Sequence, residues 1–319
     1  MPSIAVIGTG QIGSRYLQGL VQIKSKIKIL AVDAFPQAQK LAQQRWAESG
    51  GNKSIHEIEW LSDFNNYNSN IDLAIIATPS FNRNLLIRDV RLKMNPKYWI
   101  IEKVLAQSKK AIDLIEFEVM KAKGAWVNTP RRLMSWHKLL KSKFFGKGPL
   151  RIIKIGGLWG LACNAIHFID LVAWWSGESL LSVNSATLDR TWFKSKRSGY
   201  FEVCGDLFVR FSGGTELLLR SNYETLEDAI SVKIFNNNDL WTIYEERGIA
   251  SSSNGTTLNG RLENQSEITA PLVDKILKHG TCDLPTLNES SKLHRILLDS
   301  MLVHWNKSYN LKDKQVPIT

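Results

Sequence analysis

The stretch of sequence that decides the fold lies near the N-terminus, where Ile4–Gly13 reads IAVIGTGQIG. Its apolar, β-branched beginning predicts a strand, and residues 11–22 predict a helix. A glycine-rich turn between a strand and a helix is typical of a diphosphate site, because free amides at the helix start point at the ligand. Gly8 would allow the tight turn, Gly10 would leave room for a pyrophosphate, and Gly13 would let the helix lie close to its strand. Read alone, the loop is also compatible with a plain strand-to-helix turn.

Asp33 strengthens the dinucleotide interpretation. It ends the next predicted strand, 20 residues after Gly13, where an acidic side chain accepts hydrogen bonds from the adenosine ribose hydroxyls. A carboxylate there repels a 2′-phosphate, and no arginine occurs in residues 34–37, so NAD(H) is favoured over NADP(H). The alternative is that Asp33 only begins the turn before Pro36. The expected cofactor contacts in this region are Gly8, Thr9, Gly10, Gln11, Ile12, Gly13 and Asp33.

The N-terminal part of the chain alternates short β-branched runs with helical stretches, which is typical of βαβ units around a parallel sheet. The predicted strands are 4–7, 27–32, 73–77, 98–101 and 125–128, and the predicted helices are 11–22, 36–46, 82–93 and 108–123. The sequence therefore predicts the α/β fold class, with a first domain over residues 1–127.

After Pro130 the pattern changes. Helices are predicted at 131–143, 162–175, 268–279 and 288–305, and strands at 150–156, 207–211, 215–221, 230–235 and 240–244. Turn residues at 212–214 and 236–238 separate consecutive strands, which indicates antiparallel pairing. The polar stretch 251–259 predicts a loop. These features define a second α/β domain over residues 128–319 with a mainly antiparallel sheet.

The bulk composition fits a folded protein of two domains, with 319 residues, 44% hydrophobic and 22% charged. The first strand begins almost at Met1 without a leader pattern, and the apolar runs are too short for a membrane span. The three cysteines, Cys163, Cys204 and Cys282, are far apart and show no metal-ligand spacing. We therefore expect a soluble, cytoplasmic protein with neither a disulfide framework nor a metal site.

The formal net charge of +11 is compatible with nucleic acid, a membrane surface or a small acidic ligand, because positive potential attracts all three. The basic residues are mostly dispersed, and the denser groups within 138–147 and 194–197 lack a nucleic-acid fold signature. We expect no nucleic-acid or membrane partner. We interpret these basic residues as solvated surface residues. The second interpretation is that they bind an anionic group of a substrate.

Four motifs in this order and at these separations resemble the glucose-fructose oxidoreductase / inositol dehydrogenase (Gfo/Idh/MocA) family: IAVIGTGQIG at 4–13, IIATP at 75–79, IEK at 101–103 and HFID at 167–170. Each motif is weak alone, and the set is specific. The resemblance implies a NAD-binding Rossmann domain followed by an α/β domain whose open sheet often forms an oligomer interface, here a dimer or tetramer. It also implies sugar, cyclitol or nucleotide-linked sugar substrates, and cofactor contacts from Thr78, Pro79 and Glu102.

The same resemblance assigns the chemistry to Lys103 and His167. Lys103 matches the lysine of the family's Glu-Lys-Pro motif, with Val104 in place of the proline, and its cation would stabilise the alkoxide-like charge on the reacting oxygen. His167 matches the acid/base histidine, and imidazole suits that task because its pKa lies near neutrality. Read alone, Lys103 is a solvated surface lysine and His167 a buried histidine on an apolar helix.

One departure concerns the residue four before this histidine, where the family commonly has an aspartate and this chain has Cys163. A thiol is mostly neutral at pH 7 and is a poor hydrogen-bond partner, so it does not simply replace a carboxylate. Substrate contacts are expected from Lys103, His167, Cys163, Asn164, Trp159 and Arg131. The alternatives are that Trp159 is a core residue, as tryptophans more often are, and that Arg131 is part of a helix start at Pro130. Arg83 stands where many relatives have a histidine, and its role is open.

The leading hypothesis is an NAD(H)-dependent oxidoreductase that moves a hydride to or from a hydroxyl or carbonyl carbon of such a substrate. The second hypothesis is a non-enzymatic, NAD-binding regulatory protein of the same fold, in which Cys163 marks a lost activity. The third is a nucleic-acid-binding protein, which predicts strongly salt-dependent binding of polyanions and no cofactor.

Overall fold

The computed structural model describes residues 1–224, 231–236 and 239–319. The chain forms two compact units, each treated by itself below. The first contains residues 1–106, 110–128 and 263–288, and the second contains residues 107–109, 129–262 and 289–319.

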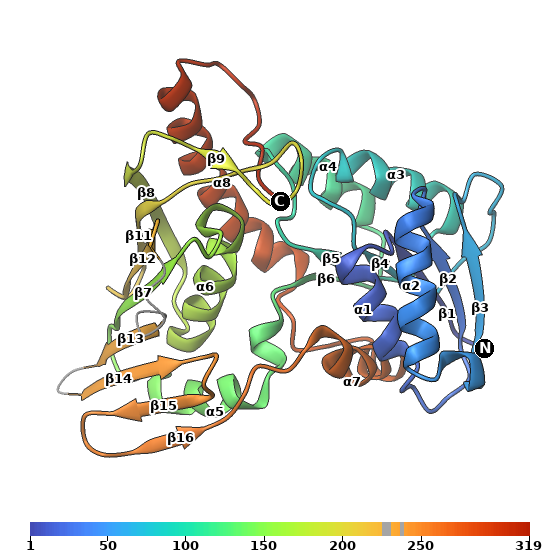
Figure 1. Cartoon of the computed structure of the whole chain (residues 1–319), viewed down its shortest axis with the longest axis horizontal. Helices are drawn as coiled ribbons and strands as arrows, with labels where there is room; N and C mark the ends of the chain where they lie inside the picture. The colour runs from blue at the N-terminus through green and yellow to red at the C-terminus, as the bar shows by residue number, and fades with distance from the viewer. Residues whose placement is uncertain (225–230, 237–238) are drawn as a thin grey trace. The chain divides into compact units, whose positions relative to one another are not determined.

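The first unit is built on a parallel sheet of six strands in the order β3-β2-β1-β4-β5-β6 (Figure 1). The strands are β1 (Ser3–Ile7), β2 (Lys28–Val32), β3 (Glu57–Leu61), β4 (Leu73–Ile76), β5 (Tyr98–Glu102) and β6 (Gly124–Asn128). The chain begins at β1 in the middle of the sheet, continues through β2 to β3 at one edge, and then returns to β4, from which the other half of the sheet is built. This is the doubly wound order, in which ligands bind where the strand order reverses, here at the carboxyl ends of β1 and β4. Strand β3, which carries charged residues at alternate positions, was not predicted.

Helices α1 (Gln11–Leu20) and α2 (Pro36–Glu48) connect the strands of one half, and α3 (Arg83–Met94) and α4 (Lys109–Val119) those of the other. Right-handed crossovers place these two pairs on opposite faces of the sheet. Helix α7 (Gln265–His279) packs against α1. A Cβ atom on Gly19 would lie 2.5 Å from the carbonyl oxygen of Ser266, so the missing side chain lets the two helices approach closely. Residues 263–288 thus return to the first unit, which the expected division at residue 127 did not include.

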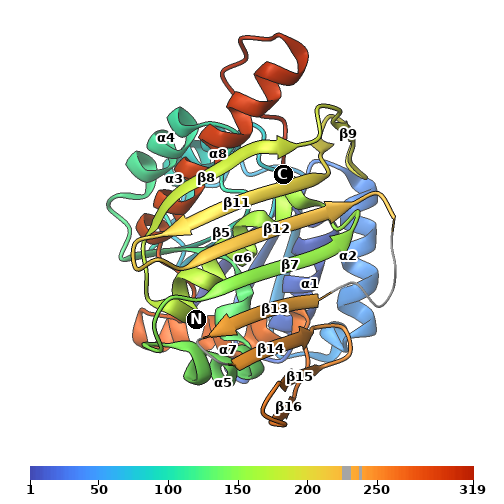
Figure 2. The same cartoon turned by 90° about the vertical axis from the view of Figure 1, so that its left-hand side faces the viewer.

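The second unit contains an eight-stranded sheet in the order β16-β15-β14-β13-β7-β12-β11-β8 (Figure 2). Its strands are β7 (Arg151–Gly157), β8 (Leu180–Leu188), β11 (Gly205–Phe211), β12 (Glu216–Asn222), β13 (Ser231–Asn236), β14 (Asp239–Tyr244), β15 (Ile249–Ser252) and β16 (Thr257–Asn259). Only the β7–β12 pair is parallel, which confirms the mainly antiparallel sheet. A separate pair is formed by β9 (Phe193–Lys194) and β10 (Phe201–Glu202).

Two predictions for this unit need correction. The expected loop at 251–259 contains the end of β15 and all of β16, because edge strands pair through their backbones and tolerate Ser, Thr and Asn. The expected helix 131–143 is divided into a 3₁₀ turn (Pro130–Leu133) and α5 (Ser135–Phe144), with extended backbone at Met134. Ile230 of the expected strand 230–235, and Asn237 and Asn238 of the expected turn, lie outside the described residues.

Helices α6 (Leu161–Ser176) and α8 (Leu287–Tyr309) complete this unit. Figure 2 shows the sheet in front with α6 behind it, so one sheet face carries helices and the other is open. Within the described ranges no helix is long and apolar enough to span a bilayer. The same residues contain no cluster of His, Cys, Asp and Glu suited to a metal ion.

Candidate functional site

The glycine loop has the geometry that a bound diphosphate requires. Gly8 has a φ of +89°, and a Cβ there would lie 2.8 Å from Cγ2 of Thr78. A Cβ on Gly13 would lie 1.8 Å from the carbonyl oxygen of Gly8, whereas a Cβ on Gly10 would meet nothing within 4 Å. Gly8 and Gly13 are therefore required by the packing of the loop. Gly10 faces open space next to the first amides of α1, where a ligand can approach the backbone.

Asp33 is joined to this loop directly. Its Oδ2 accepts a hydrogen bond of 2.6 Å from the backbone N–H of Thr9, and Oδ1 accepts one of 2.9 Å from Phe35. The expected role in a turn is thus present, since the carboxylate fixes the start of the segment before α2. The side chain is half-buried and stands at the carboxyl end of β2, where a ribose would lie in a doubly wound sheet.

Glu102 occupies a buried position at the end of β5. Its Oε1 accepts hydrogen bonds from the Tyr16 hydroxyl at 2.9 Å and from Nδ2 of Asn128 at 2.6 Å. Burial raises the pKa of the Glu102 carboxyl, and the hydrogen bonds from Asn128 and Tyr16 oppose that rise. The carboxylate therefore ties α1, β5 and β6 together.

Lys103 follows Glu102 in a segment held by Arg83. The Arg83 side chain is buried, and its Nη1 donates to the carbonyl oxygens of Glu102 at 2.5 Å, of Leu105 at 3.2 Å and of Val104. Its Nη2 donates to the carbonyl oxygen of Thr78. One guanidinium thus fixes the backbone on both sides of Lys103 and joins it to the loop after β4. The open role of Arg83 is accordingly that of a positioning residue.

In the second unit, the predicted substrate residues gather on the accessible side of α6. Cys163, Asn164 and His167 are half-buried, and the other residues of the first two turns are buried. His167 follows Cys163 by four residues and Asn164 by three, and these spacings place all three side chains on one surface of the helix. Trp159 lies just before the helix, where its carbonyl oxygen accepts a 2.8 Å hydrogen bond from Nδ2 of Asn164. The structure therefore brings these four predicted residues together.

A carboxylate that was not predicted lies at the start of α6. Glu202 is buried, and its Oε2 and Oε1 accept the backbone N–H groups of Ala162 at 2.8 Å and Cys163 at 3.3 Å. Both Glu202 Oε1 and Cys163 Sγ lie 3.3 Å from the position that a Cβ on Gly160 would take. The negative charge therefore stabilises the positive end of the helix dipole beside Cys163.

Arg131 forms a buried ion pair within the second unit. Its Nε and Nη2 donate to Glu245 at 2.8 and 2.9 Å, and its guanidinium lies 4.6 Å from the Phe168 ring centroid. His137 Nε2 lies 3.1 Å from the same carboxylate. Burial alone would raise the pKa of Glu245, but Arg131 and His137 hold it well below its ordinary value. Arg132 forms a similar bidentate pair with Asp170, at 2.9 and 2.6 Å.

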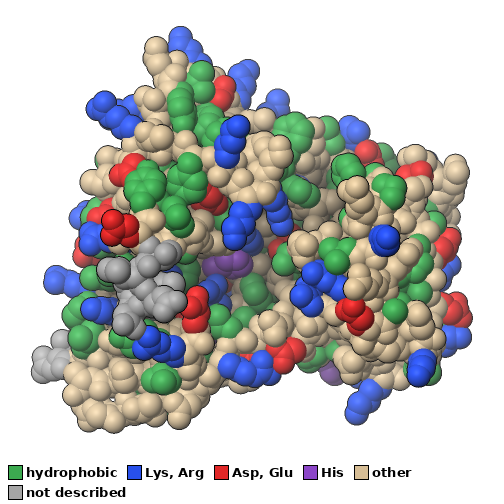
Figure 3. All heavy atoms as spheres, viewed as in Figure 1, with side chains coloured by type: hydrophobic (Ala, Val, Ile, Leu, Met, Phe, Trp, Pro, Cys, Tyr) green, Lys and Arg blue, Asp and Glu red, His purple; other side chains and the backbone are tan. Residues whose placement is uncertain are grey.

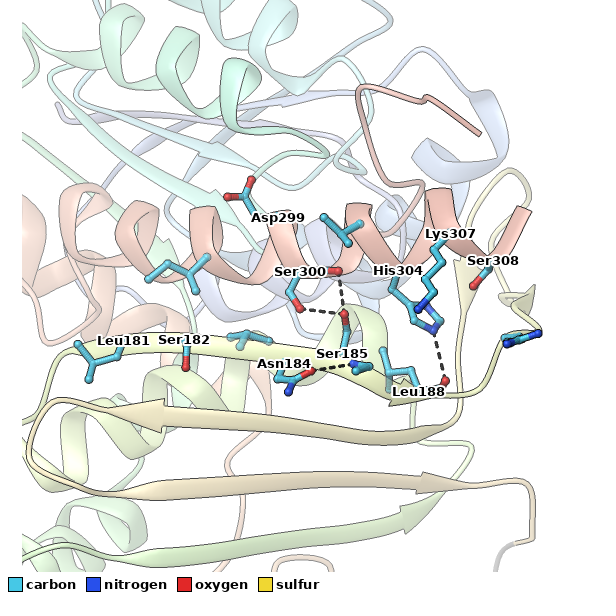
Figure 4. A pocket seen from close by; sticks show the side chains of 15 residues that line it. Leu181, Ser182, Asn184, Ser185, Leu188, Asp299, Ser300, His304, Lys307 and Ser308 are labelled. Carbon is cyan, nitrogen blue, oxygen red and sulfur yellow. Dashed lines mark hydrogen bonds between the residues drawn. The ribbon is translucent and has the colours of Figure 1, made fainter. Parts of the chain in front are cut away.

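A separate cavity of about 820 Å³ lies between β8 and α8 (Figure 4). Ser185 donates to the Ser300 carbonyl oxygen at 2.9 Å, and the Ser300 hydroxyl donates to Ser185 Oγ at 2.9 Å. His304 accepts from the Trp192 indole at 3.1 Å, and burial lowers its pKa. None of the predicted site residues lines this cavity. These polar groups form hydrogen bonds with one another and are therefore poorly suited to take part in a reaction. We place the candidate site at the predicted residues instead.

Sequence reasoning missed Glu202, Glu245 and Lys154. Lys154 had a detectable signal, because the period of two in β7 places it on the same face as Ile152 and Gly156, and all three are buried. Glu202 and Glu245 had none, since their partners lie far away in the sequence.

No family model and no curated protein matches the sequence. The fold defines the class: an α/β protein with a parallel doubly wound sheet and a second, mainly antiparallel sheet, as in the Gfo/Idh/MocA dehydrogenases. Solved structures with this fold include scyllo-inositol dehydrogenase from Lactobacillus casei with NAD(H) and scyllo-inositol, at a TM-score of 0.66 and 15% identity over 96% of this chain and 97% of that one.

Two further structures have the same fold. An oxidoreductase from Agrobacterium radiobacter in complex with NAD⁺, L-tartaric acid and magnesium has a TM-score of 0.69 at 15% identity, over 95% of this chain and 96% of that chain. UDP-N-acetylglucosamine 3-dehydrogenase GnnA from Acidithiobacillus ferrooxidans has a TM-score of 0.65 at 14% identity, with the same two coverages.

Proposed function

We propose that this chain is an NAD(H)-dependent dehydrogenase or reductase acting on a CH–OH group of a sugar, cyclitol or nucleotide-linked sugar. The observation that carries the proposal is the glycine loop at the reversal of the parallel sheet, where Gly10 alone of the three motif glycines faces open space. Thr78 packs against that loop and Asp33 is bonded to it. The solved structures of this fold that contain NAD(H) or NAD⁺, including levoglucosan dehydrogenase with NADH, support the proposal.

In this proposal the residues of each unit have defined tasks. The amides of Gly10, Gln11 and Ile12 bind the diphosphate, and Asp33 accepts the ribose hydroxyls. NAD, when bound, supplies the carbon that accepts or donates the hydride. Lys103 stabilises negative charge on the reacting oxygen, and His167 takes or returns the hydroxyl proton. Thr9, Gly8, Gly13, Pro79 and Glu102 shape the cofactor site, and Trp159, Cys163, Asn164 and Arg131 belong to the substrate side.

Gly10→Ala tests cofactor binding with little effect on folding, because the added methyl group meets no protein atom. We expect NADH affinity, followed by NADH fluorescence, to fall roughly tenfold or more, which corresponds to about 1.4 kcal/mol, with an unchanged Tm. Gly13→Ala is the contrasting variant, since its methyl group meets the Gly8 carbonyl and should lower the Tm. Wild-type protein that binds neither NADH nor NADPH would end the proposal. Tighter binding of NADPH than NADH would correct only the cofactor preference.

Absorbance at about 340 nm, with a panel of sugars, cyclitols and nucleotide sugars, tests the chemistry. With a confirmed substrate, Lys103→Ala and His167→Ala should each lower turnover by roughly 10²-fold or more, and NADH affinity should be retained. Equal turnover by both variants and the wild type would show that the chemistry is wrongly assigned.

The competing hypotheses have less support. A glycine loop with room for a ligand is equally expected of a non-enzymatic NAD-binding regulator, and the accessible helix face that carries His167 favours the enzyme. Against nucleic-acid binding, Figure 3 shows blue basic side chains scattered among red acidic ones on the face in view. We further propose that the protein is cytoplasmic and forms a homo-oligomer, a dimer or tetramer, through the open sheet face of the second unit.

A further inference from the structure

Lys154 is an unusual residue in the second unit, because it is a lysine on the buried face of a central strand. It is only 5% exposed. Its ammonium group donates a 3.1 Å hydrogen bond to the Ile155 carbonyl oxygen, and no carboxylate among the described residues forms an ion pair with it. A buried ammonium normally has a counter-ion, since removing a charge from water is costly.

The nearest charged groups do not supply that counter-ion. Glu245 already accepts hydrogen bonds from Nε and Nη2 of Arg131, and it lies beside His137. Arg131 adds a second, half-buried cation, so Lys154, Arg131 and Glu245 together comprise two cations and one carboxylate. Burial, together with Arg131, lowers the pKa of Lys154, and Glu245 and Glu246 oppose that shift. The surroundings of Lys154 therefore contain too little negative charge to neutralise its ammonium group.

The surroundings of Lys154 are those of a recognition site. Its Nζ lies 5.6 Å from the ring centroids of both Trp159 and Phe168, which themselves meet edge to face at 5.5 Å. Aromatic faces stabilise a cation without neutralising it. Phe168 follows His167 in the sequence, and Trp159 is bonded to Asn164. The lysine thus lies beneath residues of the proposed substrate side.

Gly156 lies close to this ammonium. A Cβ on Gly156 would lie 3.5 Å from Lys154 Nζ and 3.0 Å from Trp159 Cδ1. The absence of a side chain at residue 156 therefore lets the Lys154 ammonium and the Trp159 ring lie against the backbone of β7.

We propose that Lys154 recognises a negatively charged substituent of the substrate, a carboxylate or a phosphate, and that the substrate is an anionic sugar. This inference rests on the proposed function and narrows its substrate class. The anion would supply the counter-ion that the buried ammonium lacks, and the rings of Trp159 and Phe168 would exclude water from the pair. Because a charge-assisted hydrogen bond in such a site is strong, charged sugars should bind more tightly than neutral ones.

Calorimetry in the presence of NADH tests this directly, with glucose as the neutral probe, glucuronate as the carboxylate probe and glucose 6-phosphate as the phosphate probe. We expect at least one charged probe to bind roughly tenfold or more tightly than glucose, and the preferred one identifies the anion. Lys154→Met should abolish that preference. Lys233→Met is the matched control, because Lys233 is an exposed lysine on the adjacent strand β13, and it should keep the preference.

Thermal unfolding separates recognition from a structural role. A lysine kept for ligand binding costs stability, so Lys154→Met should raise the Tm of the unliganded protein by roughly 2 °C or more. If Lys154→Met does not fold, Lys154→Gln removes the charge and keeps a donor, and it should also lose the preference. The inference is overturned if neither charged probe exceeds glucose, or if the preference survives in both Lys154 variants. NADH binding without any charge preference would refute only this inference, whereas protein that binds neither NADH nor NADPH would refute the proposed function.

Discussion

Arg83 shows how one buried side chain can fix the backbone on both sides of another residue, here the proposed catalytic residue Lys103. Its guanidinium bonds four backbone carbonyl groups around Lys103 and Thr78. Only arginine offers several donors in one rigid plane, so lysine is not an equivalent replacement. The backbone position of the loop that contains Lys103 therefore depends on a residue of helix α3.

Arg83→Met should leave those carbonyl oxygens without their donor. Each buried group that loses its partner costs about 1–3 kcal/mol, so we expect a clear fall in Tm and a fall in kcat that exceeds the change in NADH affinity. Arg88→Met is the control on the same helix, since Arg88 is exposed and pairs with its neighbour Asp89. Arg83→Lys should recover part of the stability. A variant with wild-type Tm and kcat would exclude the positioning role.

Cys163 and Glu202 lie together at the start of α6, and their proximity has a testable consequence. The family resemblance leads one to expect an aspartate at 163, but the carboxylate of Glu202 already caps the same end of α6. Cys163→Asp would place a second negative charge near the first, and like charges at close range destabilise each other. We expect a lower Tm and less activity on the natural substrate.

The double variant Cys163→Asp/Glu202→Gln separates repulsion from loss of the thiol. If repulsion is the cause, the stability losses of the two single variants should not add, and the double variant should be more stable than their sum predicts. Additive losses would mean that the two side chains do not interact. A gain of activity on simple polyols by Cys163→Asp alone would instead indicate that this cysteine marks a decayed site.

At the scale of elements, the ion pair of Arg131 and Glu245 connects the 3₁₀ turn after Pro130 to the end of β14. The pKa of Glu245 is held well below its ordinary value in the folded protein. A carboxylate with a lowered folded pKa stabilises the fold above its unfolded pKa, and that contribution is lost as the pH falls towards the folded value. Part of the acid unfolding of this protein should therefore arise from Glu245.

Glu245→Gln should cost about 3–5 kcal/mol at pH 7, because it leaves the Arg131 cation buried without its partner. Denaturant unfolding at several pH values between about 7 and 2 would measure the stability lost at pH 7 and its pH dependence. The wild type should lose stability as the pH drops below about 4.5, the ordinary carboxyl value, and the variant should show a shallower loss. Parallel pH profiles would show that Glu245 does not carry this dependence.

The sequence predicted the elements whose own residues determine them. The strands β1, β2, β4 and β5 are apolar runs, and the glycines at 8, 10 and 13 have requirements that are local. It did not predict β3 and β16, whose polar residues pair through the backbone at sheet edges. It also placed α7 in the second domain, since nothing in 265–279 shows that its partner is α1.

The candidate site also contains residues that the sequence predicts and residues that it does not. The cofactor loop follows from spacing, and the grouping of Trp159, Cys163, Asn164 and His167 follows from helical periodicity. The contacts of Arg83, Glu202 and Glu245 could not be predicted, because each residue has partners between 19 and 114 positions away. Tertiary contacts of that kind leave no periodic signal in a single sequence.

At the scale of the whole molecule, the open face of the second sheet is the main surface without a covering layer in its own unit. On this face Phe208 and Phe235 are exposed, at 43% and 40%, and Ile153, Leu218 and Leu240 are half-buried. Strand pairing places Phe208 opposite Leu218 and Phe235 opposite Leu240. The exposed cations Arg151 and Lys233 lie on the same face, opposite Phe235 and Ile153. A large exposed apolar patch on a soluble protein commonly marks an interface between subunits.

The charges at the margins of this face suit a two-fold symmetric contact. Arg220 pairs with Asp206, and Arg210 with Glu216, on the neighbouring strands β11 and β12. A symmetric interface places the same patch on both subunits, so apolar residues accompanied by charges of both signs suit a self-complementary contact. We therefore expect a homodimer built by packing two such faces together, or a tetramer that contains this contact.

Phe208→Arg places a charge in the middle of that face and should shift the protein to monomers in sedimentation velocity at low micromolar concentration. The effect is expected because two symmetry-related cations would be buried close together without partners, which costs several kcal/mol. Val303→Arg provides the control, since Val303 is 67% exposed on α8 and lies away from the sheet face. NADH affinity should be unchanged in both variants, because the cofactor residues lie in the first unit. If Phe208→Arg sediments like the wild type while Val303→Arg dissociates, the interface lies on the helical side instead.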